Sequence, residues 1–185
     1  MGCSVSTEKG MEAKEKRNSG KLRHFSVFIG IIIFAVWADQ FTKRLALTHI
    51  ALHEPHPLIP GVLELLRIEN TGAAFGILEG HMGFFYVITA VVGALILYVV
   101  CRLPAEKKYD PLLLVASFIA AGAIGNLIDR VMRKSVVDFI YFVPIDFPVF
   151  NVADIFVSCA TAALMLLILF YYKDEDLDFL KNKRS

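Results

Sequence analysis

The chain has 185 residues, of which 56% are hydrophobic, and its formal net charge is +1. The apolar residues form long runs with almost no charge, a pattern that excludes an ordinary soluble domain and is typical of a membrane protein. The basic residues form no single stripe, which argues against a general nucleic-acid binder, and the cysteines, Cys3, Cys101 and Cys159, match no metal or redox spacing.

Four segments are long and apolar enough to cross a bilayer, since a spanning helix needs about 20 mostly apolar residues. They lie at about 25–45, 82–101, 111–130 and 152–172. Residues 1–24 are polar and predict a disordered tail, and residues 173–185 predict a second, shorter tail. We therefore expect an all-α integral membrane protein with one membrane domain over residues 25–172.

The distribution of Lys and Arg predicts the orientation of these spans, because both favour short cytoplasmic segments. Thirteen lie in the two tails and the 102–110 connection, against six in or beside the 46–81 and 131–151 connections. Both termini are therefore expected to be cytoplasmic. The first span is long and has no convincing small-x-small cleavage site before Asp39, so we expect it to stay uncleaved.

The 46–81 connection carries a strand signal. Pro55, Pro57 and Pro60 exclude a helix early in it, and apolar residues nearly alternate in VLELLRIEN, residues 62–70. This pattern predicts a small β-containing flap, or cradle, lying on the outer membrane surface.

Acidic residues gather at the expected outer level. Asp39 lies about 14 residues into the first span, which places it roughly 21 Å along the helix, in the outer third. Asp129 lies near the outer end of the third span, Asp154 in the first turn of the fourth, and Asp138 on the outer connection. An ionisable residue inside a span is a functional-site hypothesis by default, so this convergence predicts a site.

The third span also predicts a polar face. Asn126, Asp129 and Arg130 are spaced to share one side of a helix. Gly122 and Gly125 keep the preceding turn narrow, which suits close helix packing beside a buried polar site.

Asp39 and Lys43 are four residues apart with the acid first, the more favourable order for a helical ion pair. A structural pair at the membrane boundary and support of a catalytic site both explain them.

Two carboxylates held close together cannot both ionise easily, so the pair shares a proton and supplies one acid and one base around a water molecule. Such a pair hydrolyses amides without a metal. Sequence spacing does not select the pair among the outer acids, and a role as helix cap also explains Asp154.

Other candidate sites are weaker. His53 and His56 are one residue short of the spacing of a helical zinc pair, and prolines exclude the helix. Ser117 and Ser158 have no histidine or lysine placed beside them, so we interpret both as packing residues. Asp146 has no matching polar partner and is expected in a loop or at a substrate rim.

Five motifs taken together resemble signal peptidase II, the prolipoprotein signal peptidase family. In chain order they are DQFTK at 39–43, NTGAAFGIL at 70–78, GAIGNLIDR at 122–130, VVDFI at 136–140 and FNVADIFV at 150–157. With the four-span topology they cover nearly everything from residue 25 to 172.

The resemblance implies a membrane aspartic endopeptidase that removes the signal peptide from prolipoproteins, cutting before a diacylglyceryl-modified cysteine. It implies that Asp138 and Asp154 are catalytic. It further implies polar and supporting roles for Asn70, Asn126, Arg130, Asn151, Asp39, Lys43 and Asp129. The implied location is a bacterial inner membrane, with the site facing the periplasm. The implied partners are lipidated precursors and membrane lipids, and no nucleic acid. No metal or cofactor is implied.

Two features of the resemblance concern loops. The stretch after VVDFI often carries a second acid in the family, whereas this chain continues with Tyr141, so the conformation of the 141–149 loop stays open. Asn70 and the Gly72 to Gly76 stretch are expected to fold over the substrate, with Phe75 sealing the site against lipid.

Two other functions also fit a small membrane protein with buried acids. An ion carrier should place acids near the bilayer midplane with a path to both faces, whereas the acids here gather near one side. A non-enzymatic assembly factor would use the Gly and Ala faces for partner helices. Cleavage of a lipidated precursor separates both from a peptidase.

Overall fold

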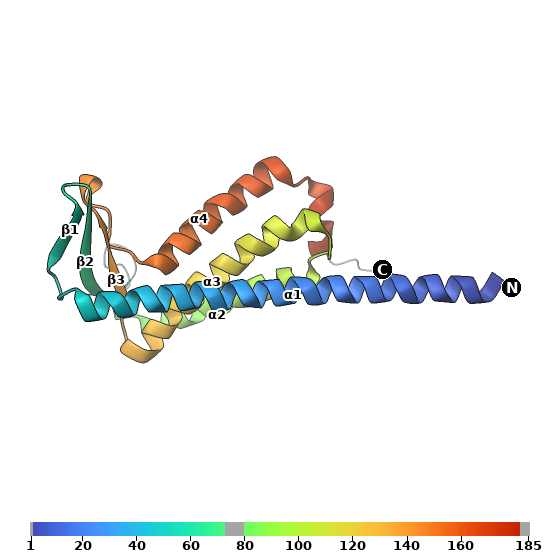
Figure 1. Cartoon of the computed structure of the whole chain (residues 1–185), viewed down its shortest axis with the longest axis horizontal. Coiled ribbons are helices and arrows are strands. Elements are labelled where there is room, and N and C mark those ends of the chain that lie inside the picture. The colour runs from blue at the N-terminus through green and yellow to red at the C-terminus, as the bar shows by residue number, and fades with distance from the viewer. Residues whose placement is uncertain (1, 73–79, 182–185) are drawn as a thin grey trace.

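The structure, a computed structural model, describes residues 2–72 and 80–181, and of residues 2–14, 16 and 17 the backbone alone. Its long helices are α1 (Gly2–His49), α2 (Met82–Arg102), α3 (Asp110–Arg133) and α4 (Val152–Leu166) (Figure 1). α4 continues through a π-helical segment, η4 (Leu167–Tyr171). All 4 are long and apolar enough to span a membrane, which confirms the predicted spans.

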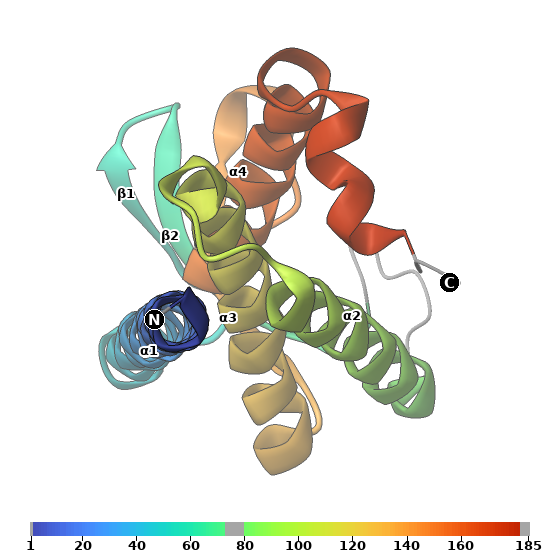
Figure 2. The same cartoon turned by 90° about the vertical axis from the view of Figure 1, so that its right-hand side faces the viewer.

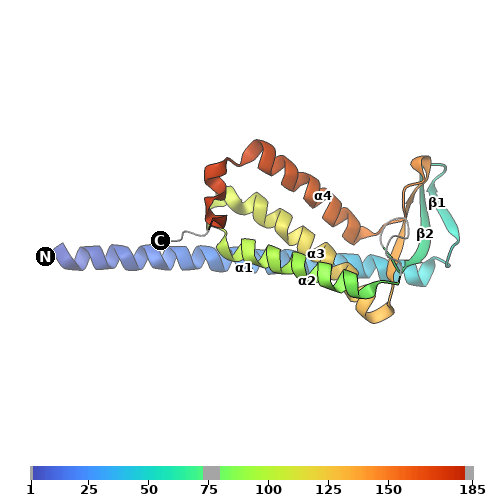
Figure 3. The same ribbon diagram turned by 180° about the vertical axis from the view of Figure 1, so that it is seen from behind.

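α1 is longer than its predicted span. The composition of residues 1–24 predicts a disordered tail, whereas the structure continues α1 as helix to Gly2. The stretch MEAKEKR at 11–17 consists of good helix formers, which accounts for the difference. Figures 1 and 3 show this part of α1 extending alone past the other helices.

α3 occupies the centre of the bundle and packs against α1, α2 and α4 (Figure 2). Its glycines make this possible. A Cβ on Gly122 would lie 2.5 Å from the carbonyl oxygen of Ala153, and a Cβ on Gly125 would lie 2.5 Å from Asp39 Oδ2. The predicted narrow face therefore exists, and it admits α4 at one glycine and α1 at the other.

A three-stranded antiparallel sheet lies at the end of the bundle away from the start of α1 (Figure 1). Its strands, in spatial order, are β1 (Pro55–Ile59), β2 (Leu63–Asn70) and β3 (Val136–Phe142). The flap predicted within 46–81 is confirmed as β1 and β2. β3 was not predicted from the sequence; it comes from the other connection, and its Asp138 lies opposite Ile68 of β2.

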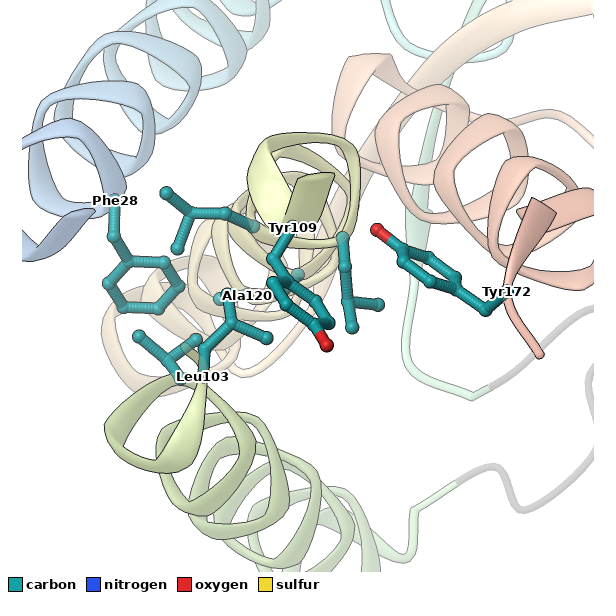
Figure 4. Packing of buried hydrophobic residues seen from close by; sticks show 9 residues of the cluster. Phe28, Leu103, Tyr109, Ala120 and Tyr172 are labelled. Carbon is teal, nitrogen blue, oxygen red and sulfur yellow. The ribbon is translucent and has the colours of Figure 1, made fainter. Parts of the chain in front are cut away.

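Two apolar clusters lie toward opposite ends of the bundle. One, behind the sheet, contains Ala46, Ile50, Val137 and Phe139. The other lies at the opposite end and includes Phe28, Leu103, Tyr109, Ala120 and Tyr172 (Figure 4).

The far cluster is closed by the chain after α4. The rings of Tyr109 and Tyr172 stack with centroids 5.8 Å apart, and the Tyr109 hydroxyl donates to the carbonyl oxygen of Asp176 at 2.9 Å. Asp176 belongs to a 3-10 helix, η5 (Asp174–Leu180), while Tyr109 ends another, η2 (Lys107–Tyr109). Polar residues gather between this cluster and the sheet.

The close approach of α3 and α4 generates a first prediction. Gly122→Ala should destabilise the folded protein by about 1–3 kcal/mol, because the added carbon forces the helices apart. Gly93→Ala on α2 is the control, since its Cβ meets nothing within 4 Å. Thermal unfolding of the purified protein in detergent measures both, and equal midpoints would contradict the packing described.

Candidate active site

Asp138 and Asp154 reach the site from β3 and from the first turn of α4. Asn151 is the N-cap of α4: its side-chain oxygen accepts from Asp154 N at 3.1 Å, while its own backbone N–H donates to Asp154 Oδ2 at 3.0 Å. Capping of α4 by Asp154 is therefore observed, as the third helical residue of a capping box whose N-cap is Asn151. It does not compete with a role in the site, because Asp154 Oδ1 faces away from this cap toward Asn126.

Asparagine amides connect the two carboxyl groups. Asn151 Nδ2 donates to Asp138 Oδ1 at 2.6 Å and to Asn126 Oδ1 at 3.1 Å, and Asn126 Nδ2 donates to Asp154 Oδ1 at 2.8 Å. Asn70 Nδ2 donates to the second oxygen of Asp138 at 3.0 Å. The two aspartates and three asparagines thus form one hydrogen-bonded unit, which is supplied by β2, α3, β3 and the start of α4.

Both aspartates line one cavity of about 560 Å³. Its polar lining consists of Asn70, Asn126, Arg130, Asp138, Asp154, Ser158 and Cys159, whereas Asn151 lies behind the lining. Its apolar lining comes from α2, β3, α4 and the loop before α4, and it includes Phe85, Val136, Phe147, Pro148, Val149, Phe150 and Ile155. A cavity that is apolar with a few convergent polar groups is the usual form of a ligand site.

Burial changes the acidity of Asp138, which is only 3% exposed. The pKa of Asp138 is raised to about 7: loss of solvent is the largest cause and the nearby charge of Asp154 adds to it, while the hydrogen bonds from Asn70 and Asn151 act in the opposite direction. Asp138 is therefore able to hold a proton near neutral pH.

A buried ion cluster lies beside the cavity. Lys43 Nζ lies 3.0 Å from Asp39 Oδ2 and 3.1 Å from Asp129 Oδ2, and it donates to Asn126 Oδ1 at 2.8 Å. Lys43, Asp39 and Asp129 are 2%, 0% and 1% exposed. The predicted pair of Asp39 and Lys43 exists, and Asp129 joins it as a third charge.

The two acids of this cluster also hold the main chain. Asp39 Oδ1 accepts from the backbone N–H of Ala153 at 3.0 Å, and Asp129 Oδ2 accepts from that of Val137 at 3.2 Å. Ala153 and Val137 each directly precede one of the cavity aspartates. The ion cluster therefore fixes the backbone from which both cavity aspartates project.

Gln40 is a member of this network that the sequence analysis did not identify. Its side-chain amide donates to Asp39 Oδ2 at 3.0 Å and to the carbonyl oxygen of Gly125 at 3.1 Å. The available signal was an uncharged polar residue inside an apolar span, directly after Asp39.

Arg130 lines the cavity on the side of α2. Its Nη2 donates to the carbonyl oxygen of Gly72 at 3.3 Å, and its guanidinium carbon lies 4.3 Å from the ring centroid of Phe85. Its Nε is buried and has no hydrogen-bond partner among the described residues. Of the expected Gly72 to Gly76 cover, Gly72 lines the cavity, while residues 73–79, with Phe75, lie outside the described residues.

The weaker candidates lie elsewhere or play other parts. Ser117 is a buried packing residue that donates to the carbonyl oxygen of Leu113, whereas Ser158 lines the cavity wall. Asp146 accepts from the Tyr141 hydroxyl at 2.6 Å, away from the cavity lining. Within residues 2–72 and 80–181, no three His, Cys, Asp or Glu side chains are grouped to hold a metal ion.

The ion cluster generates a second prediction. Lys43→Met should destabilise the protein by about 3–5 kcal/mol, because it leaves two buried carboxylates without their cation. Lys181→Met is the matched control, since it breaks an exposed ion pair with Asp178. Thermal unfolding in detergent should show a large drop for the first variant and none for the second. An equal change in the unfolding temperature of the two variants would mean that the buried cluster does not stabilise the folded protein.

Known proteins resemble this chain over most of its length. The chain matches the family described as Signal peptidase (SPase) II over residues 31–170. It is 43% identical to a lipoprotein signal peptidase of Shouchella clausii over 80% of this chain and 94% of the relative, and 45% identical to one of Caldanaerobacter subterraneus over 77% and 95%. A solved bacterial membrane enzyme superposes with a TM-score of 0.71 at 32% identity, covering 86% of this chain and 94% of its own. The chain is therefore a multi-pass membrane protease that belongs to the signal peptidase II family.

Proposed function

We propose that this protein is an aspartic endopeptidase that removes signal peptides from diacylglyceryl-modified prolipoproteins, cleaving just before the lipidated cysteine. Family membership and the names of the relatives support the substrate class. The single observation that carries the mechanism is that Asp138 and Asp154 line one cavity and are joined through Asn151.

In this proposal Asp138 is the acid and Asp154 the base. The raised pKa of Asp138, about 7, supports its holding the shared proton. Asp154 takes a proton from water as the water oxygen attacks the scissile carbonyl carbon, and Asp138 gives its proton to the carbonyl oxygen. When the tetrahedral intermediate collapses, that proton returns to Asp138 and the proton on Asp154 passes to the leaving nitrogen.

The remaining site residues position these groups. Asn126 and Asn151 orient the carboxyl groups through the bonds described above, and Lys43 with Asp39 and Asp129 fixes the backbone on either side. Asn70 and Arg130, which line the cavity, hold the substrate. The unpartnered Nε of Arg130 is a donor available to a peptide carbonyl.

The apolar cavity wall suits a substrate that stays anchored in lipid. Phe85, Phe147 and Ile155 form part of this wall next to membrane-spanning helices. We infer that the acyl chains of the modified cysteine remain in the bilayer and deliver the scissile bond at a fixed depth. The excess of basic residues in the tails supports cytoplasmic termini, with the site on the periplasmic side of a bacterial inner membrane.

The catalytic assignment generates a third prediction. Asp138→Asn and Asp154→Asn should each lower cleavage of a purified lipidated precursor by at least about 100-fold, since each removes one proton-transfer group. Asp146→Asn is the matched control: it lies outside the cavity, and asparagine tolerates its left-handed backbone, with φ at 48°.

Full activity in either Asp138→Asn or Asp154→Asn would sink this assignment. An ion carrier or an assembly factor predicts no cleavage even by the unmodified protein, so the same assay separates a peptidase from both.

The acidity of Asp138 generates a fourth prediction. If protonated Asp138 is required, kcat/KM should fall as pH rises through about 7, where Asp138 loses its proton. Asn70→Ala removes a hydrogen bond that lowers this pKa, so the alkaline limb should move to higher pH, whatever happens to the maximal rate. Tyr141→Phe is the control and should leave the limb in place. A shift to lower pH in Asn70→Ala would assign the titration to another group.

A further inference from the structure

A second polar cluster lies at the end of the bundle away from the sheet, and the peptidase site does not use it. Arg23 Nη2 donates to Asp110 Oδ1 at 2.9 Å, and His24 Nε2 lies 3.1 Å from the same oxygen. The side chains of Arg23 and Asp110 are about half exposed, whereas His24 is only 4% exposed. The cluster joins α1 to the start of α3.

His24 has an unused polar atom. Its Nδ1 is buried and has no hydrogen-bond partner among the described residues. Buried polar side-chain atoms normally have a protein or ordered-water partner, so an orphan atom beside a cavity indicates a place for a ligand.

His24 lines two cavities, of about 550 Å³ and 360 Å³. The larger lies between α1 and α3, and its polar lining consists of Arg23, His24, Lys107 and Asp110. The rest of its lining is apolar and includes Val27 and Ile31. Two cations against one carboxylate leave an excess of positive charge above an apolar wall.

The depth of this cavity matches a bilayer boundary. Arg23 precedes Asp39 by 16 positions on one continuous helix, which separates them by about 24 Å. The hydrocarbon core is about 30 Å thick, so with Asp39 in the outer third of its span, Arg23 lies near the opposite boundary of the core. Arg23 and Lys107 lie at or near the ends of the first and third candidate spans.

We propose that this cavity binds the headgroup of an anionic glycerophospholipid from the leaflet at this end of the bundle. Arg23 and Lys107 face the phosphodiester, His24 Nδ1 bonds a headgroup hydroxyl, and an acyl chain lies along Val27 and Ile31. Positive charge selects an anionic lipid over a zwitterionic one. The apolar wall favours a lipid over a free phosphate ester, which has nothing to place there.

Native mass spectrometry of the full chain in detergent, titrated with phosphatidylglycerol, tests this proposal. Lys107→Gln and Arg23→Gln should each weaken binding about fivefold, the effect of one basic residue near a membrane surface. Arg102→Gln is the matched control, a basic residue at the same end that lines neither cavity, and it should retain the original affinity. Phosphatidylcholine with the same chains should bind at least about fivefold more weakly.

Three results would overturn the proposal. Equal affinities of Lys107→Gln and the unmodified protein would place the lipid elsewhere. Glycerol 3-phosphate binding as tightly as phosphatidylglycerol would mean a soluble-anion site. Loss of binding in Asp154→Asn, which leaves this cavity untouched, would assign the lipid to the peptidase site.

Discussion

The buried ammonium group of Lys43 is the interaction on which the rest of the site depends. A lone charge at this depth is highly unfavourable, and so are the two carboxylates beside it, Asp39 and Asp129, unless each is compensated. The ammonium group of Lys43 pairs with both carboxylates, and these also accept from the backbone N–H groups next to Asp138 and Asp154. An ion cluster that looks structural is therefore also the device that sets the geometry of the cavity aspartates.

One face of α3 both packs against the neighbouring helices and contributes to the candidate site. Gly122 and Gly125 let α4 and α1 approach closely, and the approach of α1 brings the Asp39 carboxylate against the α3 backbone. Directly after Gly125, the same helix presents Asn126, whose side chain contacts Lys43, Asn151 and Asp154. Apolar clusters behind the sheet and at the far end hold the helices whose polar residues meet between them.

The four spans were predictable because hydrophobic length is a local property of the sequence. The common depth of Asp39 and Asp154 along those spans was predictable because the rise per residue of a helix is constant. The third strand was not, because VVDFI becomes a strand by pairing with β2, nearly 70 positions earlier. The choice of Asp138 as the partner of Asp154 came from the resemblance, since spacing left several acids open. Gln40 and the backbone roles of Asp39 and Asp129 escaped prediction because main-chain partners appear only once the helices are packed.

The hydrogen bond from Ala153 to Asp39 joins the first membrane helix to the last. Asp154 and its cap Asn151 also belong to that last helix, whereas Lys43 belongs to the first. A nascent chain with only three helices inserted therefore lacks one carboxylate and the bridging amide, and its buried acid on α1 lacks a backbone donor. Under the proposed aspartic mechanism, a chain that ends before α4 therefore has no complete acid–base pair, although three of its helices are already present.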